Sequence, residues 1–108
     1  MTAFEIKNGG DGNYRIAGNL TFATASAALR AMAPLFSEGA SLRLDLRDVC
    51  KADSAGAALL VEWVRRARQS GCELRYAQLP ETLLAIIRVY GVDKLLPTDS
   101  GSSQVQNN

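Results

Sequence analysis

The segment from residue 41 to residue 49, SLRLDLRDV, constrains the fold more than any other part of the sequence. Apolar and charged side chains alternate along it, and this period of two predicts a β-strand with one apolar face. A central parallel strand covered by helices on both faces would instead be a continuous apolar run. The segment CELRYA, residues 72–77, alternates in the same way. We therefore predict an α/β fold of two layers, with helices mainly on one face of a mixed sheet.

Two further strands and three helices complete the predicted order β-β-α-β-α-β-α. The segments AFEIK and YRIAG alternate on either side of NGGDGN, which predicts a hairpin. Apolar residues at spacings of three and four predict helices over residues 21–36, 54–71 and 80–91. In the first helix, Thr21 is the expected N-cap and Pro34 is expected to kink or end the helix. The predicted core contains Phe22, Leu29, Leu42, Leu44, Leu46, Leu60, Val64 and Leu74.

Length and composition narrow the class of protein. The 108 residues suffice for one domain, predicted over residues 1–97, and residues 98–108 are predicted to form a disordered polar tail. The formal net charge is +1 with scattered charges, whereas a nucleic-acid-binding domain carries a clustered basic face. Since the sequence contains no histidine, a serine or cysteine nucleophile lacks its usual base and a metal site lacks a common ligand. We predict no catalytic residues, no cofactor, no metal and no nucleic-acid partner.

The cysteines and the hydropathy pattern indicate the cellular compartment in which we expect the protein. Cys50 and Cys72 are expected at opposite ends of the sheet, too far apart for a disulfide. The longest apolar stretch, residues 55–64, falls well short of the ~20 residues that a membrane-spanning helix needs. The first ten residues do not have the pattern of a secretory signal. We therefore expect free thiols and a cytoplasmic protein.

The segment CKADSAGAALL, residues 50–60, contains the candidate site. Asp53 and Ser54 stand where a predicted strand gives way to a helix, and either residue is suited to be the N-cap. Ala55 and Gly56 begin a run of small residues, although glycine costs up to ~1 kcal/mol relative to alanine in a helix. A helix start with so little bulk presents its N–H groups and a hydroxyl to a partner or a phosphate. We predict that Ser54 caps the helix and also lies at the centre of a partner-binding surface.

Trp63 lies on the same predicted helix, one turn beyond Leu59 and at the margin of its apolar stripe. Packing in the core is one interpretation of this position. The other is an anchor on the partner-binding surface, because tryptophan is enriched among interface hot spots.

Three segments of the chain resemble the STAS-domain family, the fold of anti-sigma-factor antagonists and of sulfate-transporter tails. They are GNLTFATA, LRLDLRDVCKADSAGAALLVEWVRRARQSG and LPETLLAIIRVYGVDKLLP, so the resemblance extends over nearly the whole chain up to Pro97. Its most specific part is the motif D-S-x-G between a strand and a helix that begins with small residues. The resemblance implies that Ser54, the hydroxyl residue after the aspartate, is a regulatory position.

Two branches of the family are similar to the chain. In the antagonist branch a second hydroxyl residue usually follows the one that a partner kinase phosphorylates, and Ala55 departs from that pattern. The MlaB branch comprises small cytoplasmic subunits of the Mla phospholipid ABC transporter of Gram-negative bacteria, and the segments TFATA and VYGVDKLLP favour it. This branch implies a non-catalytic subunit that binds and supports the transporter's ATPase subunit, and that reaches the inner membrane only through it. The alternative is an anti-sigma factor antagonist that an anti-sigma kinase regulates by phosphorylating Ser54.

Overall fold

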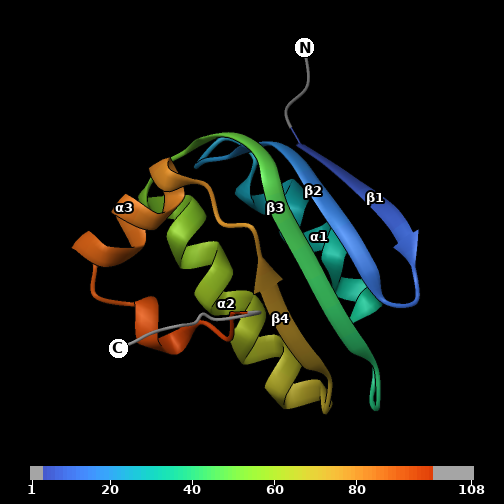
Figure 1. Cartoon of the computed structure of the whole chain (residues 1–108). Coiled ribbons are helices and arrows are strands. Elements are labelled where there is room, and N and C mark those ends of the chain that lie inside the picture. The colour runs from blue at the N-terminus through green and yellow to red at the C-terminus, as the bar shows by residue number, and fades with distance from the viewer. Residues whose placement is uncertain (1–3, 99–108) are drawn as a thin grey trace.

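A computed structural model describes residues 4–98 of the chain (Figure 1). Its elements are β1 (Phe4–Gly10), β2 (Asn13–Leu20), α1 (Ala25–Met32), β3 (Ser41–Ala52), α2 (Ser54–Ser70), β4 (Glu73–Ala77) and α3 (Glu81–Val89). Two short 3-10 helices, η1 (Ala33–Leu35) and η2 (Asp93–Leu95), follow α1 and α3. The strands and α-helices confirm the predicted order β-β-α-β-α-β-α.

The four strands form one mixed sheet in the order β1-β2-β3-β4. The first two strands form the predicted antiparallel hairpin, in which Ile6 is opposite Ile16. The hairpin turns at Asp11 and Gly12, whose φ angles are 55° and 79°. A Cβ atom at Gly12 would collide with the carbonyl oxygen of Ser41, so this position needs glycine for a close backbone approach as well. β3 then lies parallel to both β2 and β4.

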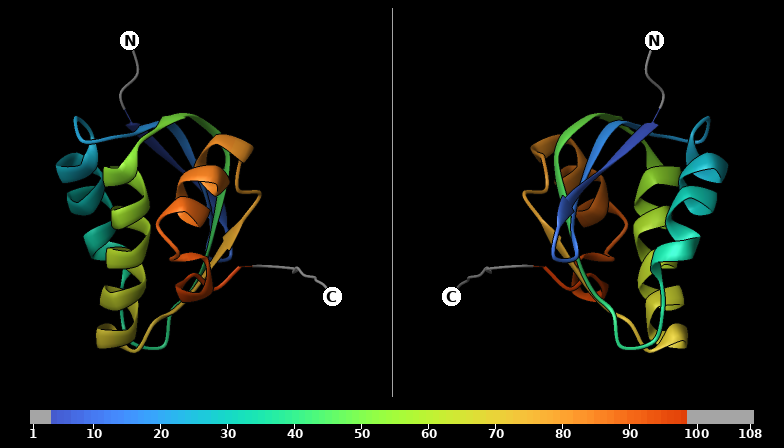
Figure 2. Two further views of the ribbon diagram at one scale, coloured as in Figure 1. Left: turned by 90° about the vertical axis from the view of Figure 1, so that its left-hand side faces the viewer. Right: turned by 90° about the vertical axis from the view of Figure 1, so that its right-hand side faces the viewer.

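α1 and α2 form a layer on one side of the sheet, whereas α3 overlaps the strands in the same views (Figure 2). α1 and α2 lie side by side, and α3 contacts α2 and β3 at the β4 side of the molecule (Figure 1). Charged side chains of β2 and β3 form ion pairs. Arg15 pairs with Asp48 at 3.5 Å, and Arg47 pairs with Asp45 at 2.7 Å. A sheet with its helices mainly on one side, built from alternating strands, confirms the predicted two-layer fold.

The hydrophobic core fills the space between the sheet and the helices. The Tyr76 hydroxyl donates a buried 2.6 Å hydrogen bond to the carbonyl oxygen of Leu60, and this bond links β4 to α2. Leu29 is half-buried and packs against the core. Six of the predicted core residues are buried, namely Leu42, Leu44, Leu46, Leu60, Val64 and Leu74.

The first helix begins later than predicted. Thr24, not Thr21, is the N-cap position of α1. The Thr24 hydroxyl accepts a hydrogen bond from the N–H of Thr21 and donates one to the carbonyl of Asn19, so residues 21–24 form a turn. This turn takes Phe22 out of the helix and leaves its side chain 85% exposed. The prediction of Phe22 as a core residue was therefore wrong.

The end of α1 agrees with the expectation of an early stop at Pro34. The helix ends at Met32, and the proline lies in the first turn of η1. This position suits proline, because the first residues of a helix have N–H groups without an intrahelical acceptor.

The third strand is longer than its alternating pattern. β3 continues to Ala52, and its register against β2 shifts between Arg15 and Ala17 and again after Gly18. Cys50 therefore lies within the strand instead of after it, and both Cys50 and Cys72 are free, as expected.

The predicted tail begins at Thr98, which forms an isolated parallel bridge with Tyr76. The remainder of that prediction, residues 99–108, lies outside the described residues.

Candidate functional site

The start of α2 is organised by the carboxylate of Asp53. The backbone of Asp53 is extended, and its Oδ1 atom accepts hydrogen bonds from the N–H groups of Ala55 at 2.9 Å and Gly56 at 3.3 Å. Asp53 is thus the N-cap, and Ser54 is the first residue of the helix. The prediction that Ser54 caps α2 was wrong, since its neighbour already satisfies those N–H groups. The Ser54 residue is exposed.

The second carboxylate oxygen of Asp53 makes a contact that the sequence did not predict. Its Oδ2 atom accepts a 3.1 Å hydrogen bond from the backbone N–H of Phe22, which lies 31 residues earlier in the chain. The N–H of Asp53 also donates to the carbonyl of Leu20 at 3.3 Å. The carboxylate therefore joins the turn after β2 to the first turn of α2.

Packing against β2 explains part of the small-residue run. Gly56 and Ala57 are buried. A Cβ atom at Gly56 would collide with the carbonyl oxygen of Leu20 and press on its Cβ atom. Ala55 is half-buried, and Ala58 is exposed. Glycine at position 56 is thus required by the approach of α2 to the end of β2, whatever binds outside.

The exposed side of Ser54 faces the groove between α2 and α3. One cavity of about 300 Å³ lies between these elements, and a second of about 280 Å³ adjoins Asp53 and Ser54. Val89 and Tyr90, at the end of α3, have exposed fractions of 80% and 60%. The lining residues are Ser54, Ala57, Ala58, Val61, Tyr90 and Val92 for the first cavity, and Asp53, Ser54, Ala85, Ile86, Val89 and Tyr90 for the second.

The sequence analysis missed this contribution of α3. Leu83 and Ile87 are buried on the inner face of the helix. Val89 and Tyr90 are exposed and do not belong to that buried face. The sequence did contain a signal for this contribution, namely two large apolar residues at the end of the predicted helix and outside its buried face. We call Ser54, Ala58, Val89 and Tyr90 the Ser54 surface.

Trp63 does not belong to the Ser54 surface. Its side chain is fully buried in the core, and its Nε1 atom has no hydrogen-bond partner among the described residues. Burial supports the core-packing interpretation, and the structure does not bring Trp63 together with Ser54 on the surface. Of the five predicted site residues, Asp53, Ser54 and Ala55 lie at the helix start, and Gly56 lies against β2.

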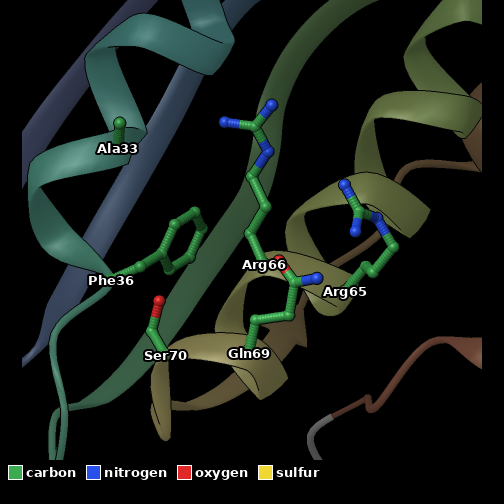
Figure 3. Close-up of a pocket in the computed structure, with 6 residues that line it drawn as sticks. All are labelled: Ala33, Phe36, Arg65, Arg66, Gln69 and Ser70. Carbon is green, nitrogen blue, oxygen red and sulfur yellow. The ribbon is translucent and has the colours of Figure 1, made fainter.

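A further cavity, of about 350 Å³, lies at the other end of α2 (Figure 3). Two arginines and a phenylalanine are prominent in its lining, which consists of Ala33, Phe36, Arg65, Arg66, Gln69 and Ser70. Both guanidinium groups bind the Glu62 carboxylate, Arg65 at 2.6 Å and Arg66 at 2.8 Å. These hydrogen bonds and charges lower the pKa of Glu62 to about 2. The arginines are thus already paired, and we do not include this cavity in the candidate site.

Residues 4–98 contain no group of three or more side chains placed to hold a metal ion. None of the helices described in that range is both long enough and apolar enough to span a membrane.

Comparisons with known proteins agree with the fold. A family model described as "Mlab, STAS domain" matches residues 7–97. The anti-sigma-B factor antagonist of Bacillus subtilis (strain 168) is 27% identical over 96 residues, which cover 89% of this chain and 88% of the relative.

Among solved structures, the chain is similar to the anti-sigma factor antagonist SpoIIAA in its unphosphorylated form. The TM-score is 0.67 and the identity 12%, over 92% of this chain and 90% of the other. The phosphorylated form of the Bacillus cell-fate determinant SpoIIAA has a TM-score of 0.59 and an identity of 13%, over 92% and 93% of the two chains. At these identities the solved structures establish the fold alone. Together with the family match over residues 7–97, they show that the chain belongs to the STAS-domain family.

Proposed function

We propose that this chain is a non-catalytic STAS subunit of a phospholipid-transporting ABC complex of the Mla type. In this role it binds the ATPase subunit and supports its assembly and activity, within a system that maintains the lipid asymmetry of the outer membrane. The description of the family match over residues 7–97 supports the Mla assignment. The chain is then a cytoplasmic protein that is peripheral to the inner membrane, and it reaches that membrane only through its partner.

The single observation that carries the proposal is the position of Ser54 on an exposed apolar surface. Ser54 lines both cavities between α2 and α3, beside the exposed side chains of Val89 and Tyr90. Asp53 is the one charged residue among the described residues that line the two cavities, and its carboxylate already accepts hydrogen bonds from three backbone N–H groups. The other described lining residues are uncharged, as in the cores of protein–protein interfaces, which are depleted of charged residues. A partner that covers this surface removes the Ser54 hydroxyl from water.

A second candidate function is that of an anti-sigma factor antagonist controlled by phosphorylation of Ser54. The similarity to the Bacillus subtilis antagonist favours it, and so does the exposure of Ser54 at the start of α2. A phosphate there would lie close to the positive end of the helix dipole. Ala55 stands where the antagonist pattern has a second hydroxyl residue, and for this reason we rank this candidate second.

The test compares two substitutions at one position. Ser54→Asp puts a charge into the contact, while Asp53 still caps the helix and an acid in the first turn favours the dipole. An unpaired charge in a desolvated contact costs several kcal/mol, and a loss of about 3–4 kcal/mol weakens affinity by hundreds of fold. Ser54→Ala leaves the contact neutral and is the control.

Wild type and both variants are titrated against the purified ATPase subunit of the Mla-type transporter from the same organism, with thermal melts of each. We expect wild type and Ser54→Ala to bind and Ser54→Asp to fold normally without binding. A folded Ser54→Asp variant with undiminished affinity contradicts the proposed surface. If the wild-type chain binds an anti-sigma kinase and not the ATPase subunit, the second candidate replaces the first. Fractionation of cells with and without the transporter tests the membrane association.

A further inference from the structure

Phe22 is the most exposed large apolar residue among those described, at 85%. It sits in the turn between β2 and α1, outside any helix or strand. Isolated exposed apolar residues are common on protein surfaces, so exposure alone assigns it no role. Its attachment to the rest of the molecule is the unusual feature.

Hydrogen bonds from both sides hold the turn that carries Phe22. The buried Thr24 hydroxyl accepts from the Thr21 N–H at 3.0 Å and donates to the Asn19 carbonyl at 2.7 Å, and the Thr24 N–H donates to the Thr21 carbonyl at 3.0 Å. On the other side the Phe22 N–H donates to Asp53 Oδ2 at 3.1 Å. The backbone of an exposed aromatic residue is thus fixed in place. Such residues make good contacts, because little conformational freedom is lost when they bind.

Asp53 connects this turn directly to the Ser54 surface. One of its oxygens caps α2 immediately before Ser54, while the other holds Phe22. The groove toward α3 opens on the far side of Ser54, where Val89 and Tyr90 are exposed. We propose that Phe22 is an anchor residue of the partner-binding surface, and that Asp53 is the residue that positions it.

This inference rests on the proposed function for the identity of the occupant, which is the ATPase subunit. The chemistry of the contact follows from the surface itself. The members of the Ser54 surface are uncharged, and the Asp53 carboxylate is already used in hydrogen bonds to three N–H groups. The matching face of the ATPase subunit is therefore an uncharged apolar recess that receives the phenyl ring.

The test uses a substitution that separates the two roles of Asp53. In Asp53→Asn the remaining oxygen still caps α2, because asparagine and aspartate are equally good N-caps. Its amide nitrogen then faces the Phe22 N–H, and two donors cannot bond to each other. Phe22→Ala removes the ring alone. Leu95→Ala is the matched control, because Leu95 is also an exposed large apolar residue, at 50%, but lies in η2 and not in the turn that Asp53 holds.

Affinity for the ATPase subunit is measured for wild type, the three single variants and the double variant at positions 22 and 53. We expect Phe22→Ala to bind at least tenfold more weakly with an unchanged thermal midpoint, as for an interface hot spot, and Leu95→Ala to bind normally. Asp53→Asn should also bind more weakly, and the double variant no more weakly than Phe22→Ala, because the two residues act as one unit. Hydrogen exchange of the Phe22 amide should be at least tenfold faster in Asp53→Asn.

The outcomes separate this inference from the proposed function. If wild type binds, Ser54→Asp does not, and Phe22→Ala binds as wild type, then Phe22 is no anchor and the proposed function stands. Additive losses in the double variant, or an unchanged exchange rate of the Phe22 amide in Asp53→Asn, overturn the positioning role of Asp53. A wild-type chain that does not bind the ATPase subunit contradicts the proposed function, and this inference with it.

Discussion

Substitution of Gly56 by alanine tests the reason for the small residues at the start of α2. The new methyl group would collide with the carbonyl oxygen of Leu20, and the Leu20 Cβ atom would lie 3.1 Å from it. A backbone oxygen at the end of a strand cannot rotate away as a flexible side chain can. The helix must therefore move away from β2, and its N-cap at Asp53 must move with it.

Two opposing terms set the size of the effect. An extra methyl group in a packed interior costs about 1–3 kcal/mol. Replacing glycine by alanine within a helix returns up to ~1 kcal/mol. We therefore expect Gly56→Ala to lower the free energy of unfolding by about 1–2 kcal/mol. Propensity alone predicts the opposite sign, so the direction of the change decides between the two explanations.

The measurement is urea unfolding of wild type, Gly56→Ala and Ala58→Gly. Ala58 is exposed on the same helix, so Ala58→Gly gives the propensity difference without a packing change. Hydrogen exchange of the Phe22 amide reports whether the cap has moved. If Gly56→Ala is as stable as wild type or more stable, the close approach of α2 to Leu20 does not restrict position 56, and the packing explanation is refuted.

Two further predictions concern the sheet. Leu44→Ala removes a fully buried side chain of β3 and should cost ~2–5 kcal/mol in denaturant unfolding; a loss below about 1 kcal/mol would mean that Leu44 contributes little to the core. The pKa of Asp45 is the basis of the other prediction. Burial raises this pKa, but the hydrogen bonds and charge of Arg47 outweigh burial and hold it below the ordinary value of 3.8. A group with a lowered pKa stabilises the fold above its unfolded pKa, and this contribution is lost as the pH falls through the folded value. Asp45→Asn should therefore be less stable than wild type at pH 6, and the difference should shrink at pH 3. An equal difference at both pH values would contradict the pairing with Arg47.

The strands and their order along the chain were predictable because a period of two is a local property of the sequence. The alternation of Leu42, Leu44 and Leu46 with charged residues also predicted that the helices would lie on one face. The start of α1 was not predictable in this way. Phe22 has the spacing of a helical stripe, but the hydrogen bonds of the Thr24 hydroxyl place a turn there instead. Spacing cannot distinguish a residue inside a helix from one just before it.

The motif located the candidate site, but it did not show how the site is built. Asp53 and Ser54 were both suited to the N-cap and we predicted Ser54, whereas the fold shows that the Asp53 carboxylate serves both α2 and Phe22. That hydrogen bond spans 31 residues, a separation over which periodicity carries no information. Gly56 was interpreted as an exposed feature because the approach of Leu20 depends on how α2 packs onto β2.

The strand order β1-β2-β3-β4 has a consequence for how the chain folds during synthesis. The strands are neighbours in space in the order in which the ribosome produces them, so no strand has to insert between two that are already paired. The hairpin of β1 and β2 emerges before β3, and hairpins form in about 1–10 μs. Translation adds only about 5–20 residues per second. The hairpin can therefore be complete before β3 leaves the ribosome, and each later strand adds to the single edge that is still open on that side.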